Sequence, residues 1–164
     1  MTEVILALGS NLGDRPGNLR RAIELLGDEG IAVQRASSVW ETPPVPADQP
    51  PYLNAAVVAE TALTPPELLG AAKRIEHTLG RRPNRHWGPR PIDIDILFYG
   101  AEQVDEPGLQ VPHVRIAERA FVLVPLSEVV SGPLPVLGAT ALALLARLAV
   151  EGLRRTEHVL VAAA

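Results

Sequence analysis

The stretch Ile92-Asp93-Ile94-Asp95-Ile96-Leu97-Phe98 alternates large apolar residues with two acids. β-Branched and aromatic residues in such an alternation predict a strand, whose successive side chains point to opposite faces. Asp93 and Asp95 therefore share one face, and we expect the isoleucines and Phe98 to face the core on the other. Burying two unpaired carboxylates is too costly, so their face meets water, a cation or a ligand. This layout is typical of a divalent-metal site.

Composition limits the class of protein. A chain of 164 residues with 47% hydrophobic and 21% charged residues predicts one domain, residues 1–164, with a true core. A net charge of −4 argues against a nucleic-acid partner. No apolar run reaches the roughly 20 residues needed to cross a membrane. Glu3 stands where a signal peptide carries basic residues, and there are no cysteines, so we expect a cytoplasmic monomer.

Two helices have clear start signals. Asp14 is the expected N-cap of a helix that follows a first strand over residues 4–8. Thr64-Pro65-Pro66-Glu67 matches a capping box with proline at the first helical position, and Gly80 ends that helix. These signals place one helix after the first strand and one directly before the aspartate strand.

The other expected elements are strands and helices read from periodicity. They are strands over residues 33–40, 52–60 and 158–161, a hairpin over 102–111, and helices over 116–130 and 140–153. Two helices among about four antiparallel strands predict an α+β ferredoxin-like sandwich. We expect its helices to pack on one face of the sheet and leave the other face open, with C-terminal helical and hairpin additions.

Cationic residues flank the acid pair on both sides. A bare Asp-x-Asp pattern is weak evidence for a site, and a solvated strand with salt-bridged loops would explain it equally well. However, Arg81, Arg85 and Arg90 precede the pair, and His113 and Arg119 follow it. Carboxylates that hold Mg²⁺ beside arginines that grip phosphate are what phosphoryl transfer from a nucleotide requires.

Tyr52 and Asn54 share a face of their predicted strand. An aromatic ring beside an amide suggests a site for a flat heterocycle, although an exposed strand face would carry the same residues. The neighbouring Thr42-Pro43-Pro44 segment is rigid and can present fixed backbone groups to a ligand. The segment Gly9-Ser10-Asn11-Leu12-Gly13 lacks the Lys-Ser/Thr ending of a P-loop, and we interpret it as a structural turn.

Together these motifs resemble those of one enzyme family, the hydroxymethyl-dihydropterin pyrophosphokinases of the folate pathway. The matching stretches run in family order through nearly the whole chain. They are residues 8–13, 42–44, 48–50, 52–55, 74–76, 87–90, 93–96 and 111–113, followed by Arg119 and Phe121. The resemblance implies transfer of the β,γ-pyrophosphoryl group of ATP to the hydroxymethyl group of a reduced pterin, with release of AMP.

The resemblance also implies roles for individual residues. Two Mg²⁺ ions would be held by Asp93 and Asp95 and would bridge the ATP phosphates. The implied catalytic set also contains Arg81, Arg90, His113 and Arg119. The pterin would lie between Tyr52 and Phe121 and be read by Asn54, Thr42 and the backbone around Pro44 and Val45, with Trp87 on a closing loop. The implied nucleotide-binding residues are Glu76, Arg85, Ile96, Leu109 and His113.

Three positions depart from the family pattern. Pro83 replaces a second loop arginine, whose role we assign to Arg82 or Arg85; His86 replaces an arginine, and Val114 an aromatic residue. Two other readings of the chain remain open. A two-metal phosphohydrolase would use the same aspartates with water as nucleophile, and a non-catalytic ferredoxin-like ligand-binding domain would not use them.

Overall fold

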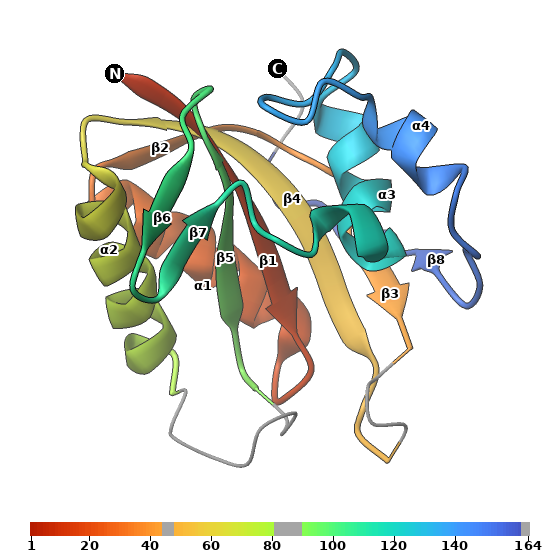
Figure 1. The fold of residues 1–164 in the computed structure, drawn as a ribbon. Coiled ribbons are helices and arrows are strands. Elements are labelled where there is room, and N and C mark those ends of the chain that lie inside the picture. Colours follow the sequence, from red (N-terminus) through yellow and green to blue (C-terminus); the bar gives the residue numbers. More distant parts are fainter. Residues whose placement is uncertain (44–47, 81–89, 162–164) are drawn as a thin grey trace.

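The fold is a mixed α+β sandwich built on one large sheet (Figure 1). The structure, a computed structural model, describes residues 1–43, 48–80 and 90–161. The helices are α1 (Arg15–Asp28), α2 (Pro65–Thr78), α3 (Ala120–Val129) and α4 (Ala141–Leu145), with a 3-10 turn over Ile116–Glu118. The strands are β1 (Thr2–Ser10), β2 (Ile31–Ala36), β3 (Trp40–Thr42), β4 (Tyr52–Thr61), β5 (Asp93–Tyr99), β6 (Val104–Glu106), β7 (Leu109–Val111) and β8 (Arg154–Arg155).

The strands of the large sheet run antiparallel in the order β5-β1-β4-β3-β8, and β2 also pairs with β4. The hairpin of β6 and β7 is the predicted addition beside β5. Both predicted helix starts are confirmed: the Asp14 carboxylate accepts from the Gly17 N–H, and Thr64 and Glu67 form a capping box. The α+β prediction with an antiparallel sheet and packed helices is therefore confirmed.

Helices cover both faces of the sheet, which corrects the expectation of an open face. Helices α1 and α2 pack on one face through Leu19, Leu26, Leu68 and Ile75. Helices α3 and α4 cover part of the other, where they meet side chains that include Ile5, Val58 and Phe98. The run 55–59 of β4 explains the difference, since its residues are all apolar and buried, as in a strand covered on both sides.

Phe98 lies in the second of these two cores, and its expected place beside the isoleucines is wrong. Ile5 of β1 pairs with Phe98, whereas Leu6 pairs with Ile96, so Leu97 is an extra residue in β5. Such a β-bulge reverses the alternation of side chains beyond it. Asp93 and Asp95 precede the bulge, so the alternation predicted for them holds.

The expected strand over residues 33–40 is divided into β2 and β3. Between them the Ser37 hydroxyl accepts from the Ala56 N–H at 2.9 Å, where a regular ladder would place a backbone carbonyl. At the C-terminal end, α4 is far shorter than the expected helix over 140–153, and residues 158–161 form no strand. Residues 141–146 are all apolar, so their spacing did not identify the inward face, and Leu142 is 67% exposed.

No helix within the described ranges is long and apolar enough to span a membrane.

Candidate functional site

Asp93 and Asp95 lie on β5 opposite Gly9 and Ala7 of β1. Both aspartates line one cavity of about 550 Å³, together with Tyr52 of β4. The remaining lining comes from β1, from the end of β3, from β4, from Arg90 before β5, and from the segment 113–122, which includes the start of α3. We call this space the Tyr52 cavity. Its size lies within the range of small-molecule sites.

Four side chains predicted to bind the flat substrate line the Tyr52 cavity: Thr42, Tyr52, Asn54 and Phe121. The Asn54 side-chain amide donates to the Thr42 hydroxyl at 2.7 Å, which fixes the orientation of the amide. Its carbonyl oxygen lies close to the Gly9 Cα, where a Cβ would approach it to 2.8 Å. A hydrogen-bonding edge and an aromatic ring therefore stand side by side on β4.

The cationic side of the same cavity contains Arg90 and Arg119, and His113 also lines it. Arg90 Nη1 lies 3.2 Å from Asp93 Oδ1, and both side chains are largely buried. The Arg119 guanidinium lies over the Phe121 ring at 5.6 Å from its centroid, within the range of a cation–π contact. Positive groups and the two aspartates thus line one cavity, an arrangement that suits a polyanionic ligand.

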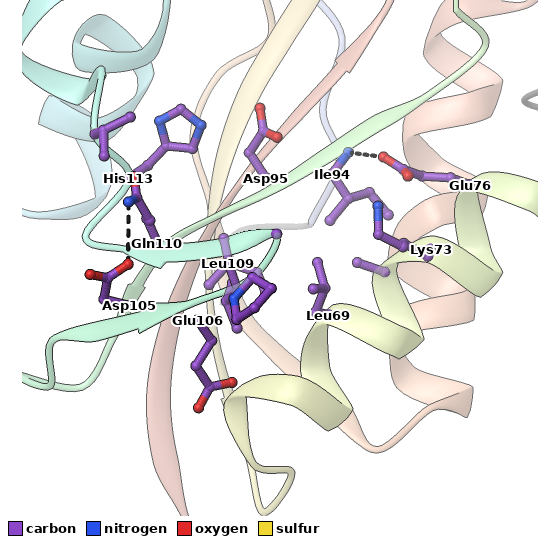
Figure 2. Close-up of a pocket in the computed structure, with 15 residues that line it drawn as sticks. Leu69, Lys73, Glu76, Ile94, Asp95, Asp105, Glu106, Leu109, Gln110 and His113 are labelled. Carbon is purple, nitrogen blue, oxygen red and sulfur yellow. Dashed lines mark hydrogen bonds between the residues drawn. The ribbon is translucent and has the colours of Figure 1, made fainter. Parts of the chain in front are cut away.

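A second cavity of about 750 Å³ lies between α2 and the β6–β7 hairpin, with β5 as its floor (Figure 2). We call it the Leu109 cavity. Four residues predicted to bind nucleotide line it: Glu76, Ile96, Leu109 and His113. Asp95 and His113 line both cavities, so the two spaces meet at these side chains.

Glu76 joins α2 to the aspartate strand. Its Oε2 accepts from the backbone N–H of Ile94 at 2.9 Å, in a side chain that is 8% exposed (Figure 2). Ile94 stands between Asp93 and Asp95 and pairs with Leu8 of β1, while its N–H donates to Glu76 of α2. The predicted nucleotide-binding carboxylate thus also fixes the strand that carries the aspartates.

Burial lowers the pKa of the His113 imidazole below its ordinary value. The Asp95 carboxylate opposes this shift by favouring the charged form, whereas Arg119 and Arg115 add to it. The His113 Nδ1 accepts from the Arg115 backbone N–H at 3.3 Å. The lowered pKa favours the uncharged imidazole, and with Nδ1 accepting, that form carries its hydrogen on Nε2.

Asn11 ties together the backbone on two sides of the Tyr52 cavity. Its side-chain oxygen accepts from the Arg90 N–H at 2.7 Å, and its amide donates to Gln49 Oε1 at 3.1 Å and to the Pro50 carbonyl at 3.3 Å. Asn11 is fully buried. The interpretation of residues 9–13 as a structural turn agrees with these contacts.

The two aspartates can bind a metal ion when a bound substrate supplies further oxygen ligands. Within the described part of the chain, no three or more Asp, Glu or His side chains gather where they could hold a metal ion. Mg²⁺ is commonly bound by one or two carboxylates together with substrate phosphates, rather than by an all-protein cage. Two aspartates beside a cationic cavity fit that pattern.

Comparison with known proteins gives the family. The sequence model of the 7,8-dihydro-6-hydroxymethylpterin-pyrophosphokinase family (HPPK) matches residues 5–131. This chain belongs to that family. It is 46% identical over 159 residues to the 2-amino-4-hydroxy-6-hydroxymethyldihydropteridine pyrophosphokinase of Methylorubrum extorquens, covering 96% of this chain and 100% of the relative.

Longer relatives contain the HPPK region as one part. The mitochondrial folate synthesis bifunctional protein of Pisum sativum is 52% identical over 127 residues, which cover 77% of this chain and 25% of the relative. The chain thus spans about a quarter of the length of that relative. The HPPK-DHPS protein of Plasmodium falciparum with pteroate has a TM-score of 0.72 at 15% identity, covering 89% of this chain and 44% of that one, and supports the fold alone.

The structure brings together every predicted HPPK site residue that it describes. Several residues named in the sequence analysis lie outside the described ranges: Pro44, Val45, Arg81, Arg85 and Trp87, as well as Arg82 and His86. Residues without a predicted role also line the cavities: Gly9, Arg115 and Glu118 in the Tyr52 cavity, and Lys73 and Gln110 in the Leu109 cavity. Lys73 precedes Glu76 by one helical turn, so helical spacing could have indicated its position.

Proposed function

We propose that this protein transfers the β,γ-pyrophosphoryl group of ATP to the hydroxymethyl group of 6-hydroxymethyl-7,8-dihydropterin and releases AMP, as a step of folate biosynthesis. The observation that carries the proposal is the pair of cavities that meet at Asp95 and His113. A transfer between two substrates needs two sites that converge on one reacting centre. Membership of the HPPK family supports the same reaction.

The pterin is assigned to the Tyr52 cavity. A flat ring would stack between Tyr52 and Phe121, while the Asn54 amide, oriented by Thr42, reads its hydrogen-bonding edge. The ATP base and ribose are assigned to the Leu109 cavity, against Ile96 and Leu109. This arrangement leaves the polyphosphate to run past Asp95 and His113 toward the pterin hydroxyl.

The reaction forms one bond to phosphorus and breaks one. The pterin hydroxyl oxygen attacks the β-phosphorus and releases its proton to solvent. The bond from the β-phosphorus to the oxygen bridging it to the α-phosphorus breaks, and AMP leaves with that oxygen. Arg90, Arg119 and the neutral His113 donate hydrogen bonds to phosphoryl oxygens as charge shifts onto them. Stacking of the pterin holds its hydroxyl in line, which removes much of the entropic barrier.

Two Mg²⁺ ions bound with ATP are part of the proposal, with Asp93 and Asp95 as their protein ligands. When bound, such ions neutralise the negative charge of the phosphates. The fit rests on two carboxylates that share one strand face beside a cationic cavity. Some predicted residues lie outside the described ranges, and their roles remain part of the proposal: phosphate binding and loop closure for Arg81, Arg85 and Trp87, and pterin binding for Pro44 and Val45.

The nucleotide product tests the proposal. The protein is incubated with ATP, Mg²⁺ and the pterin alcohol, and nucleotides are separated by chromatography. We expect AMP in an amount equal to the pyrophosphorylated pterin, and only when the pterin alcohol is present. ADP as the product, or nucleotide hydrolysis without pterin, would reject the proposal and favour the two-metal phosphohydrolase.

A further inference from the structure

The strand that carries Thr42 is held on both sides. On one side β3 pairs with β4, where Trp40 lies opposite Asn54 and Thr42 opposite Tyr52. On its other side β3 pairs with β8, which contains Arg154 and Arg155. A strand of three residues has few hydrogen bonds of its own. Its position in the Tyr52 cavity therefore depends on both neighbours.

Residues 152–156, which we call the C-terminal brace, pair with Trp40 and Glu41 of β3 and contact the residues that flank the strand. The N–H and the hydroxyl of Thr156 both donate to the Val39 carbonyl, at 2.9 and 2.8 Å. At the other end Gly152 packs so closely on Pro43 that a Cβ would lie 2.7 Å from Pro43 Cγ. Pro43 follows Thr42 and lines the Tyr52 cavity.

Glu41, between Trp40 and Thr42, joins the brace to a third element. Its Oε1 lies 3.1 Å from Arg154 Nη2, and its Oε2 lies 3.2 Å from Arg15 Nη1. Arg15 Nη1 also donates to the Pro51 carbonyl at 2.9 Å, directly before Tyr52. The hydrogen bond from Arg154 is the main cause of a lowered pKa of the Glu41 carboxyl. The Glu41 carboxylate thus connects the brace and the start of α1 to β3, and Arg15 extends the connection to the start of β4.

The brace lies beyond residue 131, where the match to the HPPK family model ends. We propose that the C-terminal brace, acting through Glu41 and Pro43, positions Thr42 and so sets the affinity of this protein for the pterin. The inference rests on the proposed function for the identity of the ligand. Glu41 and Gly152 are positioning residues, since neither is among the residues that line the Tyr52 cavity.

The first test compares two glycines. Gly152→Ala forces a Cβ against Pro43 at a φ of +76°, whereas Gly138→Ala carries the same left-handed strain, at +71°, with nothing within 4 Å. The difference between the two variants isolates the contact with Pro43. Because a misplacement of about 1 Å can cost a hundredfold, we expect a smaller shift of Thr42 to raise the pterin KM roughly tenfold in Gly152→Ala. The ATP KM should equal that of Gly138→Ala.

The second test compares two surface ion pairs. Arg154→Gln removes the brace charge that pairs with Glu41 and leaves the pair of Arg15 with Glu41, and Arg74→Gln removes the charge that pairs with Glu29 at 2.8 Å. The two pairs are similarly exposed: Glu41 is 26% and Arg154 67% exposed, and Glu29 is 28% and Arg74 61% exposed. We expect Arg154→Gln alone to raise the pterin KM and to leave the ATP KM unchanged. Thermal unfolding of each variant checks that it is folded.

The outcomes separate the brace from the proposed function. The wild type is assayed first, and absence of pterin-dependent AMP rejects the proposed function. If the wild type is active, an unchanged pterin KM in both Gly152→Ala and Arg154→Gln rejects the proposed role of the brace. So does an equal rise in the pterin and ATP KM values. If Gly152→Ala does not fold, Arg154→Gln decides.

Discussion

Gly9 is the residue at which the structure makes its sharpest quantitative prediction. Gly9 lies opposite Asn54 of β4, and a Cβ added there would stand 2.8 Å from Asn54 Oδ1 and 3.5 Å from Tyr52 Cδ1. The first distance is too short for a real contact, so Gly9→Ala must rotate the Asn54 amide. That rotation breaks the 2.7 Å hydrogen bond from Asn54 to Thr42.

The cost can be estimated from hydrogen bonds. Loss of one hydrogen bond lowers the free energy of unfolding by about 1 kcal/mol, which corresponds to a fall in Tm of roughly 2–4 °C for a domain of this size. A misoriented amide also loses about two hydrogen bonds to the pterin edge, or about 2 kcal/mol of binding. We therefore expect the pterin Kd to rise roughly thirtyfold. The ATP Kd should not change, because Gly9 does not line the Leu109 cavity.

Calorimetric titration with each substrate, together with a thermal melt, measures these quantities. Gly27→Ala is the matched control, since Gly27 lies in α1 with nothing within 4 Å of an added Cβ. That variant should keep wild-type pterin affinity and gain about 0.5–1 kcal/mol of stability from its helical position. A Gly9→Ala variant that binds pterin as tightly as the wild type would refute the reasoning.

Four further predictions concern single residues. Asp95→Asn should abolish AMP release with little change in the thermal midpoint, because its carboxylate faces both cavities; substantial residual turnover would contradict its role. Tyr52→Ala should raise the pterin Kd more than the ATP Kd in calorimetry, and equal changes would argue against stacking on this ring. Glu76→Ala removes a charged acceptor from the Ile94 N–H, so urea titration should give a free energy of unfolding lower by about 1–3 kcal/mol; an unchanged midpoint would contradict that contact. The lowered pKa of His113 means that the metal-free folded protein binds fewer protons than the unfolded chain near the ordinary value of 6.5. Its stability should therefore fall as pH falls through that value, and His113→Gln should flatten this part of the stability curve; an unaltered curve would oppose the assignment.

Local signals in the sequence predicted the parts of the fold that depend on local interactions. The starts of α1 and α2 rest on caps at Asp14 and Thr64, which act within four residues of chain. The division of β2 from β3 depends instead on Ser37 meeting Ala56, and the position of Phe98 depends on a bulge set by β1. Pairing between distant strands decides both, and periodicity along one strand does not contain that information.

The same distinction applies to the candidate site. Asp93 and Asp95 were placed on one face by strand alternation, and motif resemblance suggested partners for them. However, Gly9 approaches Asn54, which is 45 positions away in the sequence, and Gly152 contacts Pro43, which is 109 positions away. No local pattern in the sequence marks either contact. The meeting of two cavities at Asp95 and His113 likewise follows from the packing of the segment after β7 against β5, where His113 N–H donates to the Leu97 carbonyl.

The central claim is that two substrates occupy two cavities that meet at Asp95 and His113. A crystal structure of the protein with Mg²⁺, a non-hydrolysable ATP analogue and the pterin alcohol tests it most directly. We expect the pterin ring between Tyr52 and Phe121, the adenine against Leu109, and the phosphates beside Asp95. Adenine in the Tyr52 cavity, or pterin in the Leu109 cavity, would contradict the account.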